Sequence, residues 1–256
     1  TLYVWYDEGR LNKLMGKAYY FKSLSDGSYV VKVAYPVELF EEGNMPGLLA
    51  SIAGNIFGMK RIQSLRLEDV YLPMKFLKYF KGPSKGIKGV RDIFKVYDRP
   101  IVGTVPKPKA GYTPDELEKL AYEILVGGMD YVKDDENLVS PSFCRFEERA
   151  KVIMRVIDRV EKETGERKGY LVNVTAPPKE LEKRIKLVAD YGNKFIMVDI
   201  LAAGPGVWQY ARDVADEYKL AIHAHRAFHA AFTRPKDHGV AFYVIAKLAR
   251  LVGVDH

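Results

Sequence analysis

Apolar stretches of two kinds alternate along the chain from about residue 100 onwards. Short runs rich in β-branched and aromatic residues are typical of buried strands, and longer segments with apolar residues at helical spacing are typical of amphipathic helices. The predicted strands are 101–105, 129–133, 169–175, 194–200 and 220–225, and the predicted helices begin at Thr113, Phe146, Lys179, Val207 and about His238. Such an alternation predicts a parallel sheet covered by helices.

Two architectures fit this alternation, an open doubly wound sheet and a closed barrel. No Gly-x-Gly-x-x-Gly turn follows the first strand, and reactive polar residues follow the carboxyl ends of several strands, which favours the barrel. We therefore predict an α/β protein of the (β/α)8 TIM-barrel type, with only about five of its strand–helix units present. A sixth strand is expected to begin near Val254.

The part of the chain before the barrel mixes both patterns. Residues 28–35 predict a strand, residues 46–57 predict a helix with one buried face, and residues 61–72 are expected to be extended. A Gly- and Pro-containing stretch near residue 83 is typical of a linker. We divide the chain into a partial α+β N-terminal domain (1–85), a linker region (86–99) and the first part of the catalytic barrel (100–256).

The composition is that of a folded globular protein and limits its partners. The 256 residues carry a formal net charge of +7, but lysines alternate with glutamates along the predicted helices and no nucleic-acid-binding motif is present, so no specific nucleic-acid partner is expected. No apolar run approaches the roughly 20 residues that span a bilayer, and the N-terminus lacks the pattern of a signal peptide. The single cysteine, Cys144, fits a reducing compartment, so we expect a cytoplasmic protein without a membrane partner.

Charged residues follow the predicted strand 129–133. Lys133 and Asp135 fall on one face of an extended segment, and Glu136 lies where the strand stops. Two carboxylates that meet there form a hard-oxygen site suited to Mg2+. The alternative is a lysine paired with its neighbours on a solvated loop. Against that alternative, an inward lysine at the end of an apolar strand is costly to desolvate unless it has a function.

A pair of lysines, Lys107 and Lys109, flanks Pro108 at the end of the first barrel strand. Burial and a second cation would lower the pKa of such a lysine from roughly 10.4 toward neutrality. It would then serve in proton transfer, while its companion neutralises a phosphate or an enolate. The alternative is a pair of surface lysines in a proline-containing loop.

Histidines and an arginine gather at the end of the fifth barrel strand. His223 and His225 share a face of the strand, Arg226 points elsewhere, and His229 begins the following loop. A lone strand histidine is usually a core residue, but an arginine fork for phosphate beside several histidines favours a site. Together the three strand ends supply the groups for proton abstraction next to a carbonyl in a phosphorylated sugar, with the enediolate held on a metal.

Three segments resemble the best-known segments of the large subunit of ribulose-1,5-bisphosphate carboxylase/oxygenase (Rubisco), in particular its archaeal form III branch. They are Gly-Thr-Val-Pro-Lys-Pro-Lys (103–109), the stretch around Lys-Asp-Asp-Glu-Asn (128–137) and His-Ala-His-Arg-Ala-Phe-His-Ala (223–230). Residues 54–58 and 65–69 resemble the N-terminal domain of that family. The resemblance runs in order over essentially the whole chain.

The resemblance implies a lyase that adds CO2 to ribulose 1,5-bisphosphate. Lys133 would react with a non-substrate CO2 to form a carbamate, which binds Mg2+ together with Asp135 and Glu136. A Mg-stabilised enediolate would then yield two molecules of 3-phosphoglycerate. O2 would attack the same enediolate, which gives the family its oxygenase side reaction, an oxidoreductase activity of the monooxygenase kind.

The resemblance also implies roles for the other strand-end residues. Lys107 would transfer protons, including the one that quenches the final carbanion, and Lys109 would support it by binding substrate. Arg226 would bind one substrate phosphate, His229 would line the same side of the pocket, and His225 would contact a substrate hydroxyl.

The resemblance further implies assembly into a homodimer or a higher homo-oligomer. Asn55 would reach across the dimer interface into the partner's site. A Thr-Trp pair, a mobile-loop lysine and glycine-rich phosphate loops of the family are expected outside these 256 residues. The chain alone is therefore expected to be incomplete at both ends, and inactive or poorly folded.

Two other functions compete with the carboxylase. A Rubisco-like enolase or isomerase of methionine salvage keeps the carbamate lysine and the acidic ligands, but it usually replaces several substrate-binding residues, and here these all match the carboxylase. A non-catalytic barrel protein predicts eroded polar residues at the strand ends, and the strand ends of this chain keep theirs.

Overall fold

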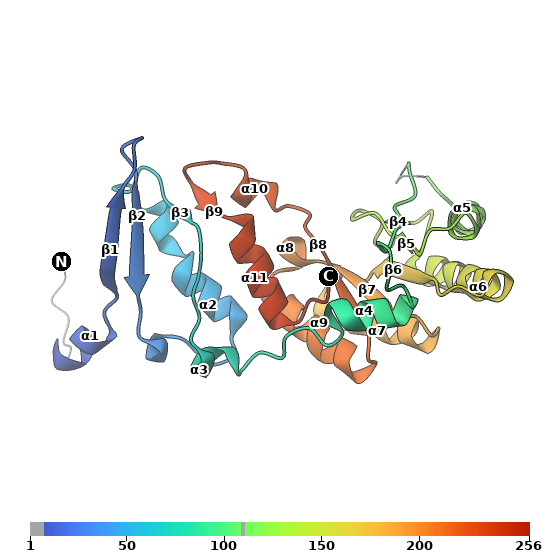
Figure 1. Ribbon diagram of the computed structural model, residues 1–256, viewed down its shortest axis with the longest axis horizontal. Helices are drawn as coiled ribbons and strands as arrows, with labels where there is room; N and C mark the ends of the chain where they lie inside the picture. Colours follow the sequence, from blue (N-terminus) through green and yellow to red (C-terminus); the bar gives the residue numbers. More distant parts are fainter. Residues whose placement is uncertain (1–7, 109–110) are drawn as a thin grey trace.

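The structure, a computed structural model, describes residues 8–108 and 111–256. The N-terminal elements lie at one end of an elongated molecule and the strand–helix series lies at the other (Figure 1). The N-terminal elements are α1 (Glu8–Leu14), β1 (Lys17–Ser23), β2 (Tyr29–Ala34), η1 (Val37–Leu39), α2 (Met45–Ile52), η2 (Asn55–Gly58), β3 (Arg66–Leu67) and α3 (Met74–Leu77).

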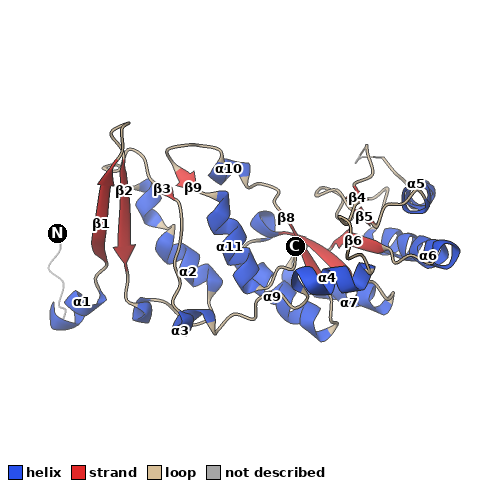
Figure 2. Ribbon diagram, viewed as in Figure 1, coloured by secondary structure: helices blue, strands red, loops and turns tan. Residues whose placement is uncertain are grey.

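The rest of the chain forms the predicted strand–helix series. Strands β4 to β8 make one five-stranded parallel sheet in chain order, and the helices lie outside it (Figure 2). The elements are α4 (Gly86–Phe94), β4 (Gly103–Thr104), α5 (Pro114–Val126), β5 (Tyr131–Lys133), α6 (Phe146–Thr164), β6 (Gly169–Asn173), α7 (Pro178–Asp190), β7 (Phe195–Asp199), α8 (Ile200–Ala203), α9 (Pro205–Glu217), β8 (Ala221–His225), α10 (Ala230–Thr233), β9 (Gly239–Val240) and α11 (Phe242–Val252). This is the beginning of an α/β barrel, as the alternation predicted. None of the described helices is long and apolar enough to cross a membrane.

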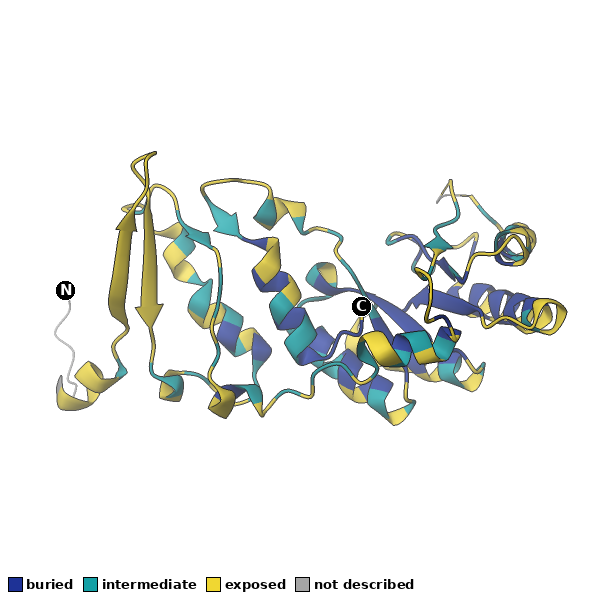
Figure 3. Ribbon diagram, viewed as in Figure 1, coloured by how far each residue is buried: buried dark blue, intermediate teal, exposed yellow. Residues whose placement is uncertain are grey.

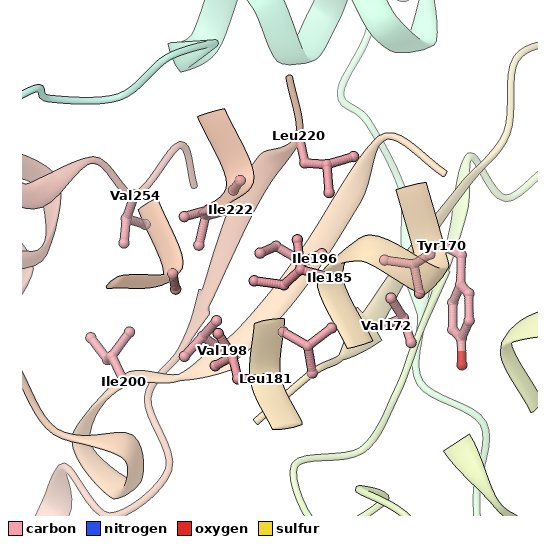
Figure 4. Close-up of a cluster of buried hydrophobic side chains, with 14 of the residues drawn as sticks. Tyr170, Val172, Leu181, Ile185, Ile196, Val198, Ile200, Leu220, Ile222 and Val254 are labelled. Carbon is pink, nitrogen blue, oxygen red and sulfur yellow. The ribbon is translucent and has the colours of Figure 1, made fainter. Parts of the chain in front are cut away.

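Alternate residues of the barrel strands face the helices and form the main core. Strands β6 and β7 are buried along their whole length, so a residue pointing away from the barrel interior must be apolar. Figure 4 shows these side chains between the strands and the surrounding helices. The labelled residues are Tyr170, Val172, Leu181, Ile185, Ile196, Val198, Ile200, Leu220, Ile222 and Val254.

The other face of the strands points into the barrel, and helix α4 closes the end of the barrel at which the strands begin. Val90 and Phe94 of α4 pack against Leu171 and Phe195, and the rings of Phe94 and Phe195 stack with centroids 4.9 Å apart. The segment 86–99, predicted as a linker region, therefore contains a helix that packs on the barrel. The domain boundaries themselves stay a prediction.

The end of the chain runs alongside β8, where a sixth strand was expected to begin. The backbone N–H of Asp255 donates to Ile222 O at 2.9 Å, and the N–H of Ala224 donates to His256 O at 2.8 Å. These bonds continue the parallel ladder beyond β8, because they join the next segment to it in the same way.

The N-terminal half departs from the sequence pattern in several places. The predicted strand 28–35 is confirmed as β2, but its antiparallel partner β1 and the helix α1 were missed. The helix predicted over 46–57 ends at Ile52, before Gly54. Within 61–72 only β3 is a strand.

The helix expected from about His238 begins four residues later. Residues 239–240 instead form β9, which pairs with β3 in parallel, and the N–H groups of Gly239 and Ala241 donate to Leu65 O and Leu67 O. Gly239 adopts φ 136°, a conformation that side-chain-bearing residues rarely adopt. This backbone angle is not helical, so the helix cannot include Gly239 and begins after it. This pairing joins the N-terminal part of the chain to the barrel series.

Candidate functional site

The register of the parallel strands brings their polar ends together at the carboxyl edge of the sheet. Asp199 lies directly opposite His225, Met197 lies opposite His223, and Lys133 lies opposite Leu171 of the neighbouring strand. Side chains on parallel strands in register point the same way, so these residues all face the barrel interior. This end of a barrel is where active sites are built.

The amine of Lys133 is buried at this edge, and no carboxylate of residues 8–108 and 111–256 forms an ion pair with it. Lys133 is 9% exposed, and among the described residues its Nζ donates only to Asp134 O at 2.6 Å and to Met197 Sδ at 3.3 Å. Burial lowers the pKa of Lys133, and the negative charges of Asp134, Glu136, Asp199 and Asp135 only partly oppose this effect. The neutral amine is therefore more populated here than on an ordinary lysine.

Lys107 and Asp135 form an ion pair across neighbouring strand ends. The carboxylate of Asp135 is buried, whereas the Lys107 side chain is 60% exposed at the mouth of the site. Burial alone would raise the pKa of Asp135, but hydrogen bonds from Lys107 and from Asn137 outweigh it and lower the pKa to about 2. The site therefore holds Asp135 as a carboxylate at any physiological pH.

The expectation that Lys107 has a lowered pKa is wrong. The hydrogen bond with Asp135 raises the pKa of Lys107, because that carboxylate stabilises the ammonium form more than partial burial disfavours it. Of the described lysines at this site, it is Lys133 whose pKa is lowered. Lys109, the other lysine of the predicted pair, lies outside the described residues.

Glu136 lies between the β5 loop and the end of β8. Its Oε2 is 3.8 Å from His225 Nε2, and its backbone carbonyl accepts a hydrogen bond from Asn173 Nδ2 at 3.0 Å. Asn173 ends β6 and also contacts the carbonyl of Asp135 at 3.4 Å. The neighbouring strand thus holds the two acidic residues through their main-chain carbonyls, and not through their carboxylates.

A buried arginine on helix α6 holds the loop that carries these acids. Arg149 is fully buried, and its guanidinium donates to Asp134 Oδ2 at 3.2 Å and to the carbonyls of Leu138 and Val139 at 3.0 Å. The Tyr170 hydroxyl donates to the other oxygen of Asp134 at 2.6 Å. Sequence reasoning missed Arg149, although one signal was present: a charged residue in the apolar stripe of a helix.

The histidines predicted to act together lie in three different settings. His223 faces the barrel interior, deeper than the strand end, where its Nδ1 is 3.2 Å from His256 Nδ1. Burial lowers the pKa of His223 to about 2. His225 lies between Asp199 and Glu136. His229 accepts a hydrogen bond from the exposed Arg226, so that this pair faces solvent beside the site.

Asn55 is exposed in the short helix η2 of the N-terminal region. Within residues 8–108 and 111–256 it makes no hydrogen bond to any of the strand-end residues. Its predicted contact with a partner's site involves a second copy of the chain and stays a prediction.

The carboxylates at the mouth fit part of a magnesium site. Within the described residues no group of three His, Cys, Asp or Glu side chains is arranged to hold a metal ion. Asp135 and Glu136 supply carboxylate oxygens, the donors that Mg2+ prefers, and Lys133 lies within range of both their charges. A carbamate on Lys133 would supply the further oxygen that the unmodified chain lacks.

Comparison with known protein families matches both halves of the chain. Residues 86–256 match the family described as the ribulose bisphosphate carboxylase large chain, catalytic domain, and residues 1–76 match the N-terminal domain of the same large chain. The ribulose bisphosphate carboxylase of Archaeoglobus fulgidus is 62% identical over 255 residues, which cover 100% of this chain and 58% of that protein. The enzyme of Thermococcus kodakarensis is 56% identical, over 100% of this chain and 57% of that protein.

Solved structures agree with the sequence comparison. A dimeric archaeal Rubisco from Hyperthermus butylicus superposes with a TM-score of 0.97 and 63% identity, over 100% of this chain and 60% of that one. An octameric Rubisco from Pyrococcus horikoshii superposes with a TM-score of 0.95 and 48% identity, over 98% of this chain and 59% of that one. The chain therefore spans less than two thirds of the length of these relatives.

Proposed function

This chain belongs to the ribulose bisphosphate carboxylase large-chain family, and from that membership we propose that the protein adds CO2 to ribulose 1,5-bisphosphate to give two molecules of 3-phosphoglycerate. O2 would compete with CO2 in a side reaction at the same site. The proposal needs three things of the described residues: an activating lysine, a set of metal ligands and a polar mouth for an anionic sugar.

The observation that carries the proposal is the buried amine of Lys133, which forms no ion pair with a carboxylate among the described residues. Only the neutral amine attacks CO2, and burial lowers the pKa of Lys133 and so favours that form. The attack forms an N–C bond and releases one proton, which converts a buried potential cation into a carbamate anion. A small pocket lined by Pro106, Tyr112, Lys133 and Asp135 lies beside the amine.

Asp135, Glu136 and the carbamate of Lys133 would hold Mg2+. When bound, the metal supplies a Lewis acid that polarises the substrate oxygens. The chain's own residues do the rest. Arg149 and Asn173 keep the acidic loop in place, and Lys107 holds a proton at the exposed mouth, next to Asp135.

The remaining predicted residues suit an anionic, hydroxyl-rich substrate. Arg226 presents an exposed guanidinium, whose fork matches a phosphate, and His229 packs against it. His225 faces Glu136 across the mouth. Lys109 would add a second cation and Asn55 would come from a partner copy.

Assembly and location follow the relatives. Because one solved relative is dimeric and another is octameric, we propose a homo-oligomer for this protein. Cys144 is free and buried, which is compatible with the reducing cytoplasm we propose.

The test is incorporation of labelled CO2 into acid-stable product by the full-length protein, with ribulose 1,5-bisphosphate and Mg2+. Wild type should fix CO2, and Lys133→Ala should fix none. Lys168→Ala is the matched control, because Lys168 is also buried but its Nζ donates to Met129 O at 2.9 Å and pairs with Glu166, away from the acidic loop. That control should keep most of the activity.

Two results would contradict the proposal. If the Lys133→Ala variant still fixes CO2, a carbamate on Lys133 is not required for the reaction. A folded wild-type protein that fixes no CO2 but exchanges the hydrogen next to a substrate carbonyl with solvent would be an enolase-type relative instead.

A further inference from the structure

The segment that follows β8 and carries Arg226 and His229 is folded back by the short helix α10. The backbone carbonyl of His229 accepts from the N–H groups of Phe232 and Thr233 at 2.9 and 3.0 Å. The ring of His229 lies between two side chains, with Nε2 against Arg226 and Nδ1 2.9 Å from the hydroxyl oxygen of Thr233. The directions of Arg226 and His229 therefore depend on where Thr233 is held.

Helix α10 cannot keep this position by itself. It has only four residues, Ala230–Thr233, and none of them is buried. A single helical turn is unstable in water, because the entropy of ordering it exceeds what its few hydrogen bonds return. Another part of the chain must therefore hold α10 in place.

Arg66, in the N-terminal half of the chain, supplies this support. Its Nη1 donates to Thr233 O at 3.3 Å and also to the carbonyl of Pro235. The last carbonyls of a helix lack partners within the helix, and a cationic donor there is favoured by charge and by the helix dipole. The side chain of Arg66 is 18% exposed and its Nε pairs with Glu68 at 2.8 Å, which fixes its direction.

The pairing of β3 with β9 brings Arg66 to this place. Arg66 lies opposite Gly239 in the parallel pair, and the N–H of Leu65 donates to His238 Nδ1 at 3.3 Å. Gly239 also lies close to α10, since a side-chain carbon built on it would be 2.2 Å from the carbonyl oxygen of Phe232. Strands β3 and β9 and helix α10 are thus in direct contact, between the N-terminal elements and the barrel series (Figure 1).

We propose that Arg66 is a positioning residue for a phosphate group of the substrate. Arg66 holds Thr233, and the hydroxyl of Thr233 fixes the ring of His229. That ring orients the exposed guanidinium of Arg226 before the ligand arrives. A long side chain that is already ordered loses less entropy on binding, which raises affinity. The hold on α10 is a property of this chain, and only the identity of the ligand rests on the proposed function.

The experiment makes two measurements on the full-length protein. Titration calorimetry gives the Kd of inorganic phosphate, and the CO2 assay gives kcat and KM for ribulose 1,5-bisphosphate. Arg66→Gln should raise both Kd and KM about 10-fold, which is what ordering one long side chain costs. Because the phosphate is bound alike in substrate and transition state, kcat should stay within about 2-fold of wild type. Urea unfolding shows that the variant is folded.

Thr233→Val tests the next contact, and it also serves if Arg66→Gln does not fold. The shape is kept, but the hydroxyl that contacts the ring of His229 is lost. Kd and KM should rise about 3-fold, less than for Arg66→Gln, because the main-chain bond from Thr233 to His229 remains. On an Arg226→Gln background neither substitution should have much further effect, since both act through that guanidinium.

Lys247→Met is the matched control. Lys247 of α11 pairs with Asp69 and lies 4.6 Å from the ring centre of Tyr243, so it too ties the segment after β3 to the barrel series. Within the part of the chain that the structure describes, none of its bonds reaches α10. The variant removes one positive charge, as Arg66→Gln does, but it should leave Kd and KM within about 2-fold of wild type.

Each outcome decides one claim. Unchanged phosphate binding in a folded Arg66→Gln variant or in Thr233→Val overturns the proposal. So does an equal loss in Lys247→Met, a loss that persists in full on the Arg226→Gln background, or a wild type whose phosphate binding does not depend on Arg226. If wild type binds phosphate through Arg226 but fixes no CO2, the proposed function fails, and the titrations alone decide the role of Arg66.

Discussion

Strands of similar composition differ in burial between the two halves of this molecule. Strands β1 and β2 of the N-terminal hairpin are exposed at every residue, whereas β6 and β7 of the barrel are buried at every residue (Figure 3). Both pairs are rich in aromatic and β-branched residues, so their intrinsic preference for the strand conformation is alike. The difference is that the surrounding helices cover the outer face of the barrel strands and helix α4 packs against residues of their inner face.

The hairpin shows what such a preference achieves without cover. Phe21 and Tyr29 are 66% and 67% exposed on one face of it, and none of the described residues covers them. An isolated two-stranded hairpin is marginally stable in water, because main-chain pairing alone barely offsets the entropy of ordering it. Substitutions should therefore have large effects in the barrel and small effects in the hairpin.

The largest effect is expected where the interior holds charge. Arg149→Ala should lower the free energy of unfolding by about 3–5 kcal/mol, because it removes the cationic partner of the buried carboxylate of Asp134 and a donor to several buried carbonyls. Urea unfolding of the full-length protein measures it. Arg155→Ala on the exposed face of the same helix is the control and should cost under about 0.5 kcal/mol. A loss below about 1 kcal/mol for Arg149→Ala would show that this network is not a main support of the loop.

A smaller loss is expected from an apolar residue of the same interior. Ile196 of β7 is fully buried among the side chains of Figure 4, and Ile196→Ala should cost about 2–5 kcal/mol through lost burial and the cavity left behind. The midpoint of urea unfolding would shift while its slope stays unchanged. An effect as small as that of a surface substitution would break the contrast between the two regions.

The interior should also make stability depend on pH. The pKa of His223 is lowered to about 2 by burial, with His256 and Lys133 adding to the effect, so the unfolded chain takes up a proton near pH 6.5 and the folded chain does not. Stability from this group is fully present above pH 6.5 and is lost as the pH falls below it. Because the ring is only partly buried, we expect a loss of about 1 kcal/mol between pH 7 and pH 5. His223→Gln should flatten this part of the unfolding profile, and an unchanged slope would assign it to other groups.

The smallest effect should come from the hairpin. Phe21→Ser should change the free energy of unfolding of this 256-residue chain by under about 0.5 kcal/mol, because the ring is already in water. Calorimetry or urea unfolding measures the change. A loss above about 2 kcal/mol would mean that this face of the hairpin is buried in solution. The hairpin and the barrel would then differ only in what buries them, since no described residue covers this face.

The spacing of apolar residues predicted those strands and helices that bury one face of their own. The strands β4 to β8 and the helices α5, α6, α7 and α9 were predicted within a few residues, whereas the short helices α8 and α10 were missed. A capping box of Thr113 and Glu116 starts the helix predicted from Thr113. The helix expected from His238 failed at its start, because residues 239–240 pair with Arg66 and Leu67, a contact that local sequence cannot show. The strand β1 was missed although its partner was found.

The site was predicted by residue type, and its geometry was not. Polar residues at the end of an apolar strand pointed to Lys133, Asp135 and Glu136, and the same signal at Asn173 and Asp199 was overlooked. The pKa of Lys107 was predicted in the wrong direction, because the carboxylate that it meets lies 28 residues away. Its effect depends on how β4 and β5 pair.

The sequence by itself determined the strand–helix series, the polar strand ends and the family, because these follow from the spacing and type of neighbouring residues. The tertiary structure decided which of those polar groups meet. The register of β7 and β8 places Asp199 opposite His225, and the packing of α6 places Arg149 beneath the acidic loop. Local spacing sets the direction of each side chain, but charges and hydrogen bonds act over a few ångströms in space, and only the assembled sheet brings residues that are far apart in the chain to that distance.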